Sequence, residues 1–401
     1  DQPRSRGLGD VYKRQINTRA NQLIHPCLSV AMLGMPLLST AQINDAPEMS
    51  MQASRPIQPW RVQETKEQRD ARMAWWREAK FGMFIHWGPY AVYGAVYQGK
   101  PYPTSEWLYE RAEIPVKAYR ENARQFHPDS FDAQAWVELA KRAGQKYIII
   151  TAKHHDGFAL WPSQYGDFNL KQSSGFARDP LAELAAACRK EGIRLGFYYS
   201  QALDFTHPGG GKSRRGAWDP AQNGDFDAYW DQVAIPQVRE LLTRYGAGVP
   251  AVLWFDVSAQ NMNPARTERM LALVQQHPQL ILNNRLSPIG PGDYSTPERD
   301  TPPRGFSDRD WEAALMTHNT WGFTSHDEKW KNSADLLRQL IDAASKGGNV
   351  LLNVAPDARG VVPAPAVERL EAIGSWLKVN GEAIYGLSLI HISEPTRPRL
   401  I

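Results

Sequence analysis

The chain has 401 residues, enough for one large barrel domain or two ordinary domains. Its formal net charge is only +3, and no block of Lys and Arg interleaved with aromatic residues occurs, which argues against nucleic acid and anionic membrane surfaces as partners. The 14 tryptophans suit a protein that stacks flat apolar faces against a ligand such as a sugar, although Trp also fills ordinary cores.

Both ends of the chain are predicted to be artefacts of DNA sequencing. Residues 387–397 read LSLIHISEPTR, and one back-translation of this stretch has a reverse complement that encodes SRGLGDVYKRQ, which is the sequence of residues 5–15. The DNA also resembles a transposase sequencing adapter. We therefore interpret residues 1–15 and 387–401 as translated adapter that takes no part in the fold.

A short apolar stretch follows the first of these segments. CLSVAMLGMPLL lies after Arg19 and before the small residues STA at 39–41. Residues 16–41 are therefore predicted to be a secretory signal peptide, and the mature chain is expected in the periplasm or outside the cell. No later apolar run is long enough to span a bilayer, so no membrane insertion of the mature chain is expected. The polar residues 42–74 suit an exposed lead-in.

From residue 75 onward, apolar runs alternate with helical patterns. Four of the helical segments carry a cap-like Asp or Asn at the start and Gly at the close, and the apolar runs are continuous, as in strands that are buried on both faces. Repeated strand–helix–strand order predicts parallel pairing of the strands. The predicted strands are 81–87, 147–152, 194–200, 251–256, 280–284 and 350–354. The predicted helices are 131–144, 179–192, 226–246, 332–348 and 363–384.

The position of polar residues decides between a doubly wound sheet and an eight-stranded barrel. In a barrel, the carboxyl ends of the strands converge on one mouth, whereas a doubly wound sheet usually carries a Gly-rich phosphate loop, which HWGPYAVYG is not. The sequence predicts an α/β fold with an irregular TIM-like (β/α)8 barrel over 75–386, because 285–310 holds no convincing helix. Side chains able to do chemistry lie at the strand ends: His86, His154, His155, Tyr198, Tyr199, Asp256, Asn284 and Arg285.

Two adjacent histidines follow the second predicted strand. On a regular strand His154 and His155 would point to opposite faces, so they share a metal ion or a pocket only if the strand ends at or before His154. The following Asp156-Gly157 predicts a turn there. We favour a ligand-binding role over a metal site and over core imidazoles bonded to backbone, and we expect neither a metal nor another cofactor.

Two carboxylates are candidates for catalysis. Asp256 ends AVLWFD, the most hydrophobic strand, where an unpaired charge is costly unless it is used; a helix cap is the alternative. Glu298 lies in GDYSTPERDTP, on the long loop after the fifth predicted strand, and Glu312 in DRDWEAALMT is its rival. A pair of carboxyl groups, one ionised and one protonated, is what cleavage of a glycosidic bond requires.

The chain resembles the family 29 glycoside hydrolases, the retaining α-L-fucosidases, from about Trp75 to Gly386. The matching segments occur in the same order as in that family. They are KFGMFIHWGPYAVYG, SEWL, FHPDSFDAQAWVELAKRAGQKYIIITAKHHDGFALWPS, GFYYS, LWFD, GDYSTPE, NTWGF and GGNVLLNVAPDARG.

The resemblance implies an exo-acting enzyme that removes terminal α-L-fucosyl residues from oligosaccharides or glycoconjugates. It implies that Asp256 is the nucleophile, which forms a covalent fucosyl-enzyme, and that Glu298 is the acid and base. The residues implied to hold the fucose hydroxyls are His86, Glu106, His154 and His155. Those implied to line the pocket are Tyr199 and Arg285, with Trp107, Trp161 and Trp321 as the apolar wall around the C5 methyl group.

The sequence departs from the family pattern at several points. Val257 stands where a glycine commonly follows the nucleophile, and the acid/base is the least constant position of the family, which keeps Glu312 open. The family's usual C-terminal β-sandwich is expected to be missing by truncation at Leu387. Alternative functions are an α-L-galactosidase variant, a sugar-binding barrel without catalysis, and a metal-dependent hydrolase that uses His154 and His155.

Overall fold

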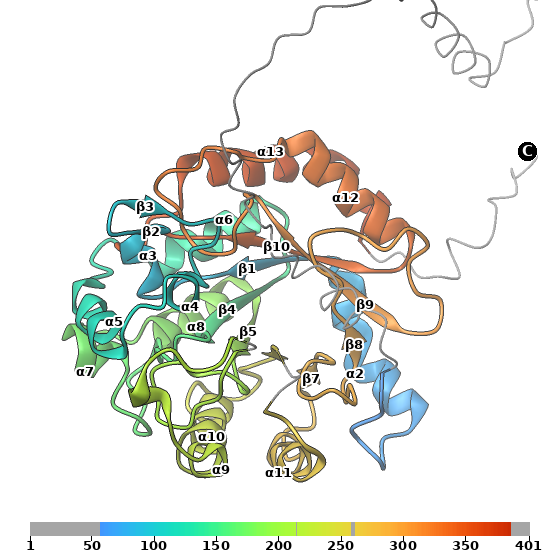
Figure 1. Ribbon diagram of the computed structural model, residues 1–401. Coiled ribbons are helices and arrows are strands. Elements are labelled where there is room, and N and C mark those ends of the chain that lie inside the picture. Colours follow the sequence, from blue (N-terminus) through green and yellow to red (C-terminus); the bar gives the residue numbers. More distant parts are fainter. Residues whose placement is uncertain (1–56, 214, 258–260, 386–401) are drawn as a thin grey trace, which may run out of the picture. The chain divides into compact units, whose positions relative to one another are not determined.

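Eight parallel strands form the centre of the computed structural model, which describes residues 57–213, 215–257 and 261–385 (Figure 1). The described residues belong to one of two units of the chain, Asp45–Ile401. The predicted signal peptide and both predicted adapter segments lie outside them. The strands are β1 Phe81–Ile85, β4 Tyr147–Lys153, β5 Arg194–Tyr199, β6 Val252–Phe255, β7 Ile281–Leu282, β8 Tyr294–Ser295, β9 Asp310–Met316 and β10 Asn349–Val354.

The sheet curls into the predicted barrel. Its strand order is β7-β6-β5-β4-β1-β10-β9-β8, and every neighbouring pair is parallel. A parallel bridge between Asn283, which follows β7, and Tyr294, the first residue of β8, links the two outermost strands, and the Asn284 N–H donates to the Tyr294 carbonyl at 3.1 Å. Because all eight strands are parallel, their carboxyl ends lie at the same rim of the barrel.

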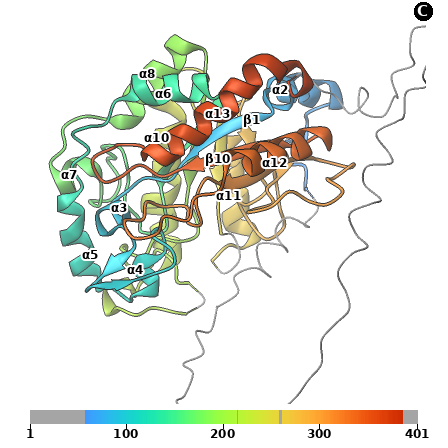
Figure 2. The same cartoon turned by 90° about the horizontal axis from the view of Figure 1, so that it is seen from above.

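Helices cover the outside of the barrel (Figures 1 and 2). Each predicted helix is present, and Asp132, Asp179 and Asn332 cap three of them by accepting backbone N–H groups, as their positions predicted. The longer helices are α2 Lys66–Ala79, α6 Ala133–Arg142, α8 Pro180–Glu191, α10 Ile235–Thr243, α11 Pro264–Val274, α12 Ser333–Ser345 and α13 Ala364–Asn380. Short elements complete the described chain: α3 Tyr90–Tyr93, β2 Val96–Tyr97, β3 Lys100–Pro101, α4 Leu108–Arg111, α5 Val116–Asn122, α7 Leu170–Ser174 and α9 Phe226–Tyr229.

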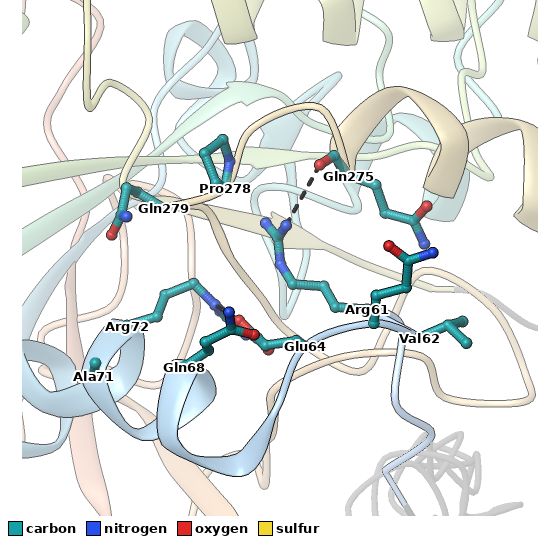
Figure 3. A pocket seen from close by; sticks show the side chains of 10 residues that line it. Arg61, Val62, Glu64, Gln68, Ala71, Arg72, Gln275, Pro278 and Gln279 are labelled. Carbon is teal, nitrogen blue, oxygen red and sulfur yellow. Dashed lines mark hydrogen bonds and ion pairs between the residues drawn. The ribbon is translucent and has the colours of Figure 1, made fainter.

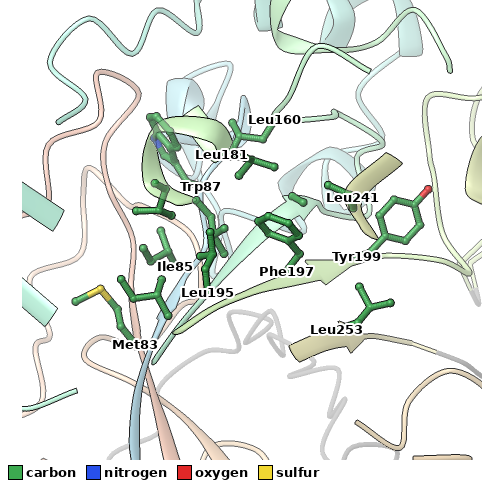
Figure 4. Close-up of a cluster of buried hydrophobic side chains, with 14 of the residues drawn as sticks. Met83, Ile85, Trp87, Leu160, Leu181, Leu195, Phe197, Tyr199, Leu241 and Leu253 are labelled. Atoms are coloured by element: carbon green, nitrogen blue, oxygen red, sulfur yellow. The ribbon is translucent and has the colours of Figure 1, made fainter. Parts of the chain in front are cut away.

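Side-chain alternation along the strands creates two hydrophobic layers. Outward side chains pack beneath the helices, and Figure 4 shows Leu195, Phe197 and Tyr199 of β5 on the side of Leu181 and Leu241 from α8 and α10. Inward side chains fill the barrel interior. The interior layer includes Phe84, Tyr147, Ile149, Tyr198, Val252, Trp254, Tyr294, Ala314 and Leu351.

Helix α2 belongs to the barrel, so the predicted domain boundary at residue 75 falls inside a structural element. Met73 and Trp76 of this helix pack into the interior layer, with Trp76 4.5 Å from the Tyr294 ring. Arg72 is buried as well and pairs with Asp293 at 2.7 Å. The part of this helix before residue 75 was predicted to be an exposed lead-in, because only one face of the helix is apolar.

A surface depression opens beside the start of α2 (Figure 3). Its lining includes Arg61, Glu64 and Arg72 together with Gln275, Pro278 and Gln279, and Arg61 donates to the Gln275 carbonyl at 3.4 Å. Residues 275–279 connect α11 to the amino end of β7. The depression therefore lies at the end of the barrel opposite the carboxyl ends of the strands, where barrel enzymes hold their active sites.

The irregular part of the barrel lies between β7 and β9. Residues 283–309 form the two-residue strand β8 and no helix, as the Pro and Gly in this stretch predicted. Strand β9 was not predicted, because Asp310 and Glu312 interrupt its apolar run DWEAALM. Both strands nonetheless complete the parallel sheet.

Candidate active site

Side chains from five strand ends meet at the carboxyl rim of the barrel. His86 follows β1, the histidine pair follows β4, Tyr198 lies near the end of β5, Asp256 follows β6 and Arg285 follows β7. Glu298 lies with them. It belongs to the loop between β8 and β9, and its backbone forms a parallel β-bridge with Ala314 of β9. All of these side chains are buried or nearly so, although most are polar, and buried polar groups need partners.

The KHHDG segment brings both histidines into this cluster. Strand β4 ends at Lys153, so His154 and His155 lie on the following loop, and their ring centroids are 4.1 Å apart. This confirms the expected strand end. The Gly157 N–H donates to the His154 carbonyl at 3.1 Å and closes the turn. Only glycine fits there, because φ is 84° and a Cβ would lie 1.9 Å from Asp204 Oδ1.

Two buried polar atoms of the residues predicted for the site have no hydrogen-bond partner among the described residues. They are Nδ1 of His154 and Oε1 of Glu106. The other carboxylate oxygen of Glu106 is held firmly, since it accepts from Thr320 Oγ1 at 2.8 Å and from the Gly322 N–H at 2.9 Å. Buried groups left unpaired are costly, and a polyhydroxylated ligand would satisfy both atoms.

Aromatic rings surround the imidazoles. Trp321 stacks on His86 at 5.2 Å, Trp107 lies 4.6 Å from His155, and Tyr198 lies parallel to His154 at 5.3 Å. The structure thus brings Trp321 and Trp107, both predicted for the apolar wall, next to the site histidines. The site combines flat apolar surfaces with hydrogen-bonding nitrogens, the combination that suits a sugar ring.

One guanidinium nitrogen joins the two candidate carboxylates. Arg285 Nη1 donates to Asp256 Oδ1 at 2.8 Å and also contacts Glu298 Oε1. Oδ2 of the aspartate accepts from the Tyr198 hydroxyl at 2.9 Å. Each hydrogen bond places an oxygen about 3 Å from the shared nitrogen. The distance between Asp256 Oδ1 and Glu298 Oε1 is therefore at most about 6 Å.

The pKa values of the two carboxyls move in opposite directions. Burial raises the pKa of Asp256, but the positive charge of Arg285, together with hydrogen bonds from Arg285 and Tyr198, outweighs it, so the pKa lies below its ordinary value. Burial also raises the pKa of Glu298, and the negative charge of Asp256 adds to this against the pull of Arg285, so the net shift is upward. The environment favours one ionised and one protonated carboxyl.

The three histidines are neutral near pH 7. Burial lowers the pKa of His86 and of His155 to about 4, and it lowers that of His154 well below its ordinary value. A neutral imidazole offers one donor and one acceptor. The rings can therefore bind uncharged hydroxyl groups without adding positive charge to the site.

Two residues predicted for the pocket lie elsewhere. Tyr199 points outward from β5, where its hydroxyl donates to Gln237 of α10 at 2.9 Å, and Tyr198 takes the place at the cluster that was expected of Tyr199. Trp161 is fully buried and donates to Glu240 of α10 at 3.1 Å. The physical reason for Tyr199 is the two-residue period of a strand, since Tyr198 and Tyr199 must face opposite sides.

Glu312, the rival acid/base candidate, lies inside the barrel rather than at its mouth. It faces Asn349, the first residue of β10, and it accepts from the Tyr147 hydroxyl at 2.5 Å and from Trp254 Nε1 at 3.3 Å. Burial raises its pKa to about 7. A raised pKa alone thus does not identify the catalytic acid, and position favours Glu298.

Two residues that support the site were missed from the sequence. Asn353 is the last residue but one of β10 and its Oδ1 lies 2.7 Å from His86 Nδ1, while Ser200 follows β5 and its Oγ lies 2.7 Å from His155 Nδ1. Both occupy strand ends, the same signal that identified the other polar residues. The sequence alone does not distinguish them, because small uncharged residues are common at strand ends for purely structural reasons.

Val257, the residue noted for departing from the family pattern, has a φ of 43°. A β-branched residue rarely adopts this left-handed conformation, because its Cβ clashes with the backbone, whereas glycine adopts it without strain. Its N–H donates to Asp256 Oδ1 at 2.9 Å, so the strained residue also holds the aspartate.

No group of three or more His, Cys, Asp or Glu side chains within the described ranges is placed to share a metal ion. No helix in the part of the chain that the structure describes is long and apolar enough to cross a membrane.

Comparisons with known proteins agree on one family. The profile of the Alpha-L-fucosidase family matches residues 49–382. The tissue alpha-L-fucosidase of Rattus norvegicus is 32% identical over 339 residues, which cover 78% of this chain and 69% of that protein. The alpha-L-fucosidase structure from Vibrio sp. strain EJY3 has a TM-score of 0.74 at 36% identity and covers 80% of this chain and 56% of that one. For the Lactobacillus casei alpha-L-fucosidase in complex with α-L-fucose product, the TM-score is 0.72 at 33% identity, with coverages of 78% and 99%.

Proposed function

The chain belongs to the α-L-fucosidase family of glycoside hydrolases, and we propose that it is an exported exo-α-L-fucosidase that removes terminal α-L-fucosyl residues from glycans with retention of configuration. The observation that carries the proposal is the pair formed by Asp256 and Glu298, which share one nitrogen of Arg285 and have pKa values shifted in opposite directions. The export part rests on the predicted signal peptide at 16–41 alone.

The distance between the two carboxyls supports retention. Retaining glycosidases separate their carboxyl groups by about 5 to 5.5 Å, and inverting enzymes need about 6.5 to 9.5 Å to admit a water molecule. The limit of about 6 Å between Asp256 Oδ1 and Glu298 Oε1 that the shared Arg285 nitrogen imposes falls on the retaining side.

The proposed reaction has two steps. Ionised Asp256 attacks the anomeric carbon and forms an ester, while protonated Glu298 gives its proton to the leaving oxygen. The same glutamate, now ionised, removes a proton from water, which attacks the anomeric carbon and frees Asp256. Arg285 and Tyr198 hold the aspartate by hydrogen bonds in the meantime, so that it faces the sugar in one orientation.

The proposed binding site accounts for the sugar's two kinds of surface. The imidazoles of His86, His154 and His155 and the free oxygen of Glu106 provide partners for vicinal hydroxyl groups. The rings of Trp321 and Trp107 lie against these imidazoles and provide apolar surface for the C5 methyl group and the sugar face. The complex of the Lactobacillus casei relative with α-L-fucose is consistent with such a ligand.

Turnover of an aryl α-L-fucoside tests the activity. The wild-type chain is expected to release the aryl alcohol, and Asp256→Ala is expected to lose this activity because it removes the carboxylate that forms the ester. Asp310→Asn is the matched control, since Asp310 pairs with Arg69 and Arg77 at the amino end of β9. Equal activity of wild type and Asp256→Ala would refute the nucleophile assignment.

Azide rescue tests which glutamate is the acid and base. With an aryl substrate that needs little protonation, azide is expected to restore turnover of Glu298→Ala by attacking the fucosyl-enzyme, and to have no effect on Glu312→Ala. Rescue of Glu312→Ala alone would transfer the role to the interior glutamate.

The same assay separates the alternative functions. An α-L-galactosidase variant would prefer the aryl α-L-galactoside, which carries one more hydroxyl, at C6. A metal-dependent hydrolase would lose activity in a strong chelator, and a sugar-binding barrel without catalysis would bind L-fucose and turn over neither aryl glycoside.

A further inference from the structure

Two of the site histidines are held through the same ring atom. Nδ1 of His86 lies 2.7 Å from Asn353 Oδ1, and Nδ1 of His155 lies 2.7 Å from Ser200 Oγ. His154 differs, because its Nδ1 has no partner among the described residues. Each contact requires a hydrogen on one of the two atoms, and the surroundings decide which atom carries it.

The amide of Asn353 has one allowed orientation. Its Nδ2 lies 2.7 Å from the Trp321 carbonyl, which can only accept a hydrogen bond. The amide nitrogen must therefore face that carbonyl, and Oδ1 must face His86. Because an amide oxygen has no hydrogen to give, the hydrogen in this contact belongs to Nδ1 of His86.

The hydroxyl of Ser200 is fixed by the same reasoning. Its single hydrogen is donated to the Leu203 carbonyl at 2.8 Å. Ser200 Oγ can then act only as an acceptor toward His155, so Nδ1 of that ring carries the hydrogen.

We propose that Asn353 and Ser200 are positioning residues that hold His86 and His155 in the Nδ1-protonated tautomer, so that both rings present an unprotonated Nε2 to the substrate. Both rings are neutral near pH 7, because burial lowers their pKa values to about 4, and a neutral ring carries one hydrogen only. Neither nitrogen Nε2 can donate. The contact of 3.6 Å between His155 Nε2 and Asp256 Oδ2 is then a meeting of two acceptors rather than an ion pair.

This assignment, which rests on the proposed function for its ligand, defines what the site recognises. A sugar group held by Nε2 of His86 or His155 must be a hydrogen-bond donor, as a free hydroxyl is. An ether or a fluorine at the same carbon offers only an acceptor and leaves a buried nitrogen unpaired. The site would therefore select unsubstituted fucosyl ends and reject those modified at these hydroxyls.

Nuclear magnetic resonance of the histidine ring nitrogens tests the tautomers directly in the intact chain. We expect His86 and His155 to carry their hydrogen at Nδ1 in the wild type, with signals assigned through His86→Gln and His155→Gln. Ser200→Ala should release His155 alone to a mixture of tautomers, and Asn353→Leu should do so for His86 alone. Thr317→Val is the control, because it removes a buried hydroxyl that bonds only the Asn353 carbonyl.

Binding of L-fucose and of its monofluorinated deoxy analogues gives a second readout. Replacing the hydroxyl held by either ring should weaken binding by about tenfold or more, and Ser200→Ala should raise KM with a smaller change in kcat. A hydrogen at Nε2 of either ring in the wild type would overturn the proposal for that ring. Correct tautomers without turnover of any α-L-fucoside would refute the proposed function instead.

Discussion

Tyr198 and Tyr199 are neighbours in the chain that face opposite sides of β5. The hydroxyl of Tyr198 donates to Asp256, and that of Tyr199 donates to Gln237 of α10. Tyr198→Phe should lower kcat/KM by about tenfold or more, because a hydrogen bond to a charged group is lost. Tyr199→Phe also removes a tyrosine hydroxyl, but one that lies on the outer face of β5, and it should leave kcat/KM near the wild-type value. Equal losses in both variants would place Tyr199 in the site after all.

Glu298 sets the alkaline side of the pH profile in the proposed mechanism. The residue acts first as an acid, so the active form is protonated, and activity is lost as pH rises through its pKa. Because that pKa is raised by burial and by Asp256, the loss should occur above the ordinary carboxyl range. Glu298→Gln should lower kcat/KM of a poorly activated substrate by about 10² to 10⁴ and abolish this alkaline limb. A limb that persists in the variant would belong to another group.

At the scale of elements, strand β9 places the carboxyl group of Glu312 in the barrel interior. Folding raises the pKa of Glu312 from 4.5 to about 7, so the folded state binds a proton that the unfolded state releases between these values. The free energy of unfolding should therefore fall as pH rises from about 4.5 to 7, by about 3 kcal/mol at most.

Glu312→Gln removes this titration. We expect the variant to lack that fall in chemical denaturation, to be more stable than wild type near pH 8, and to keep its fucosidase activity. A stability profile parallel to that of the wild type would show that Glu312 stays ionised in the folded barrel.

At the scale of the whole molecule, the repeating strand–helix pattern was enough to predict the barrel. The strands 81–87, 147–152, 194–200, 251–256, 280–284 and 350–354 correspond to β1, β4, β5, β6, β7 and β10. Their continuous apolar runs reflect burial on both faces, which a sequence displays directly. Strand β9 and helix α2 were missed because interior charges such as Glu312 and Arg72 are paired by groups distant in the chain.

The candidate site was less accessible to sequence reasoning than the fold. Strand ends identified His86, Asp256 and Arg285, and the turn after Lys153 was predicted from Asp-Gly. The choice between Tyr198 and Tyr199 depends on where β5 starts its alternation, which a five-residue apolar run does not reveal. The contact between Arg285 and both carboxylates joins residues on three separate segments, and no local pattern contains that information.

The central claim is that Asp256 becomes covalently bonded to fucose during turnover. Mass spectrometry of the protein, quenched in acid after reaction with a 2-deoxy-2-fluoro fucosyl donor that slows the second step, tests it most directly. The account predicts a mass gain of one fluorofucosyl unit, located on the peptide that contains Asp256 and absent from Asp256→Ala. Rapid turnover of the α-L-fucoside with no adduct, or an adduct on a different carboxyl, would contradict it.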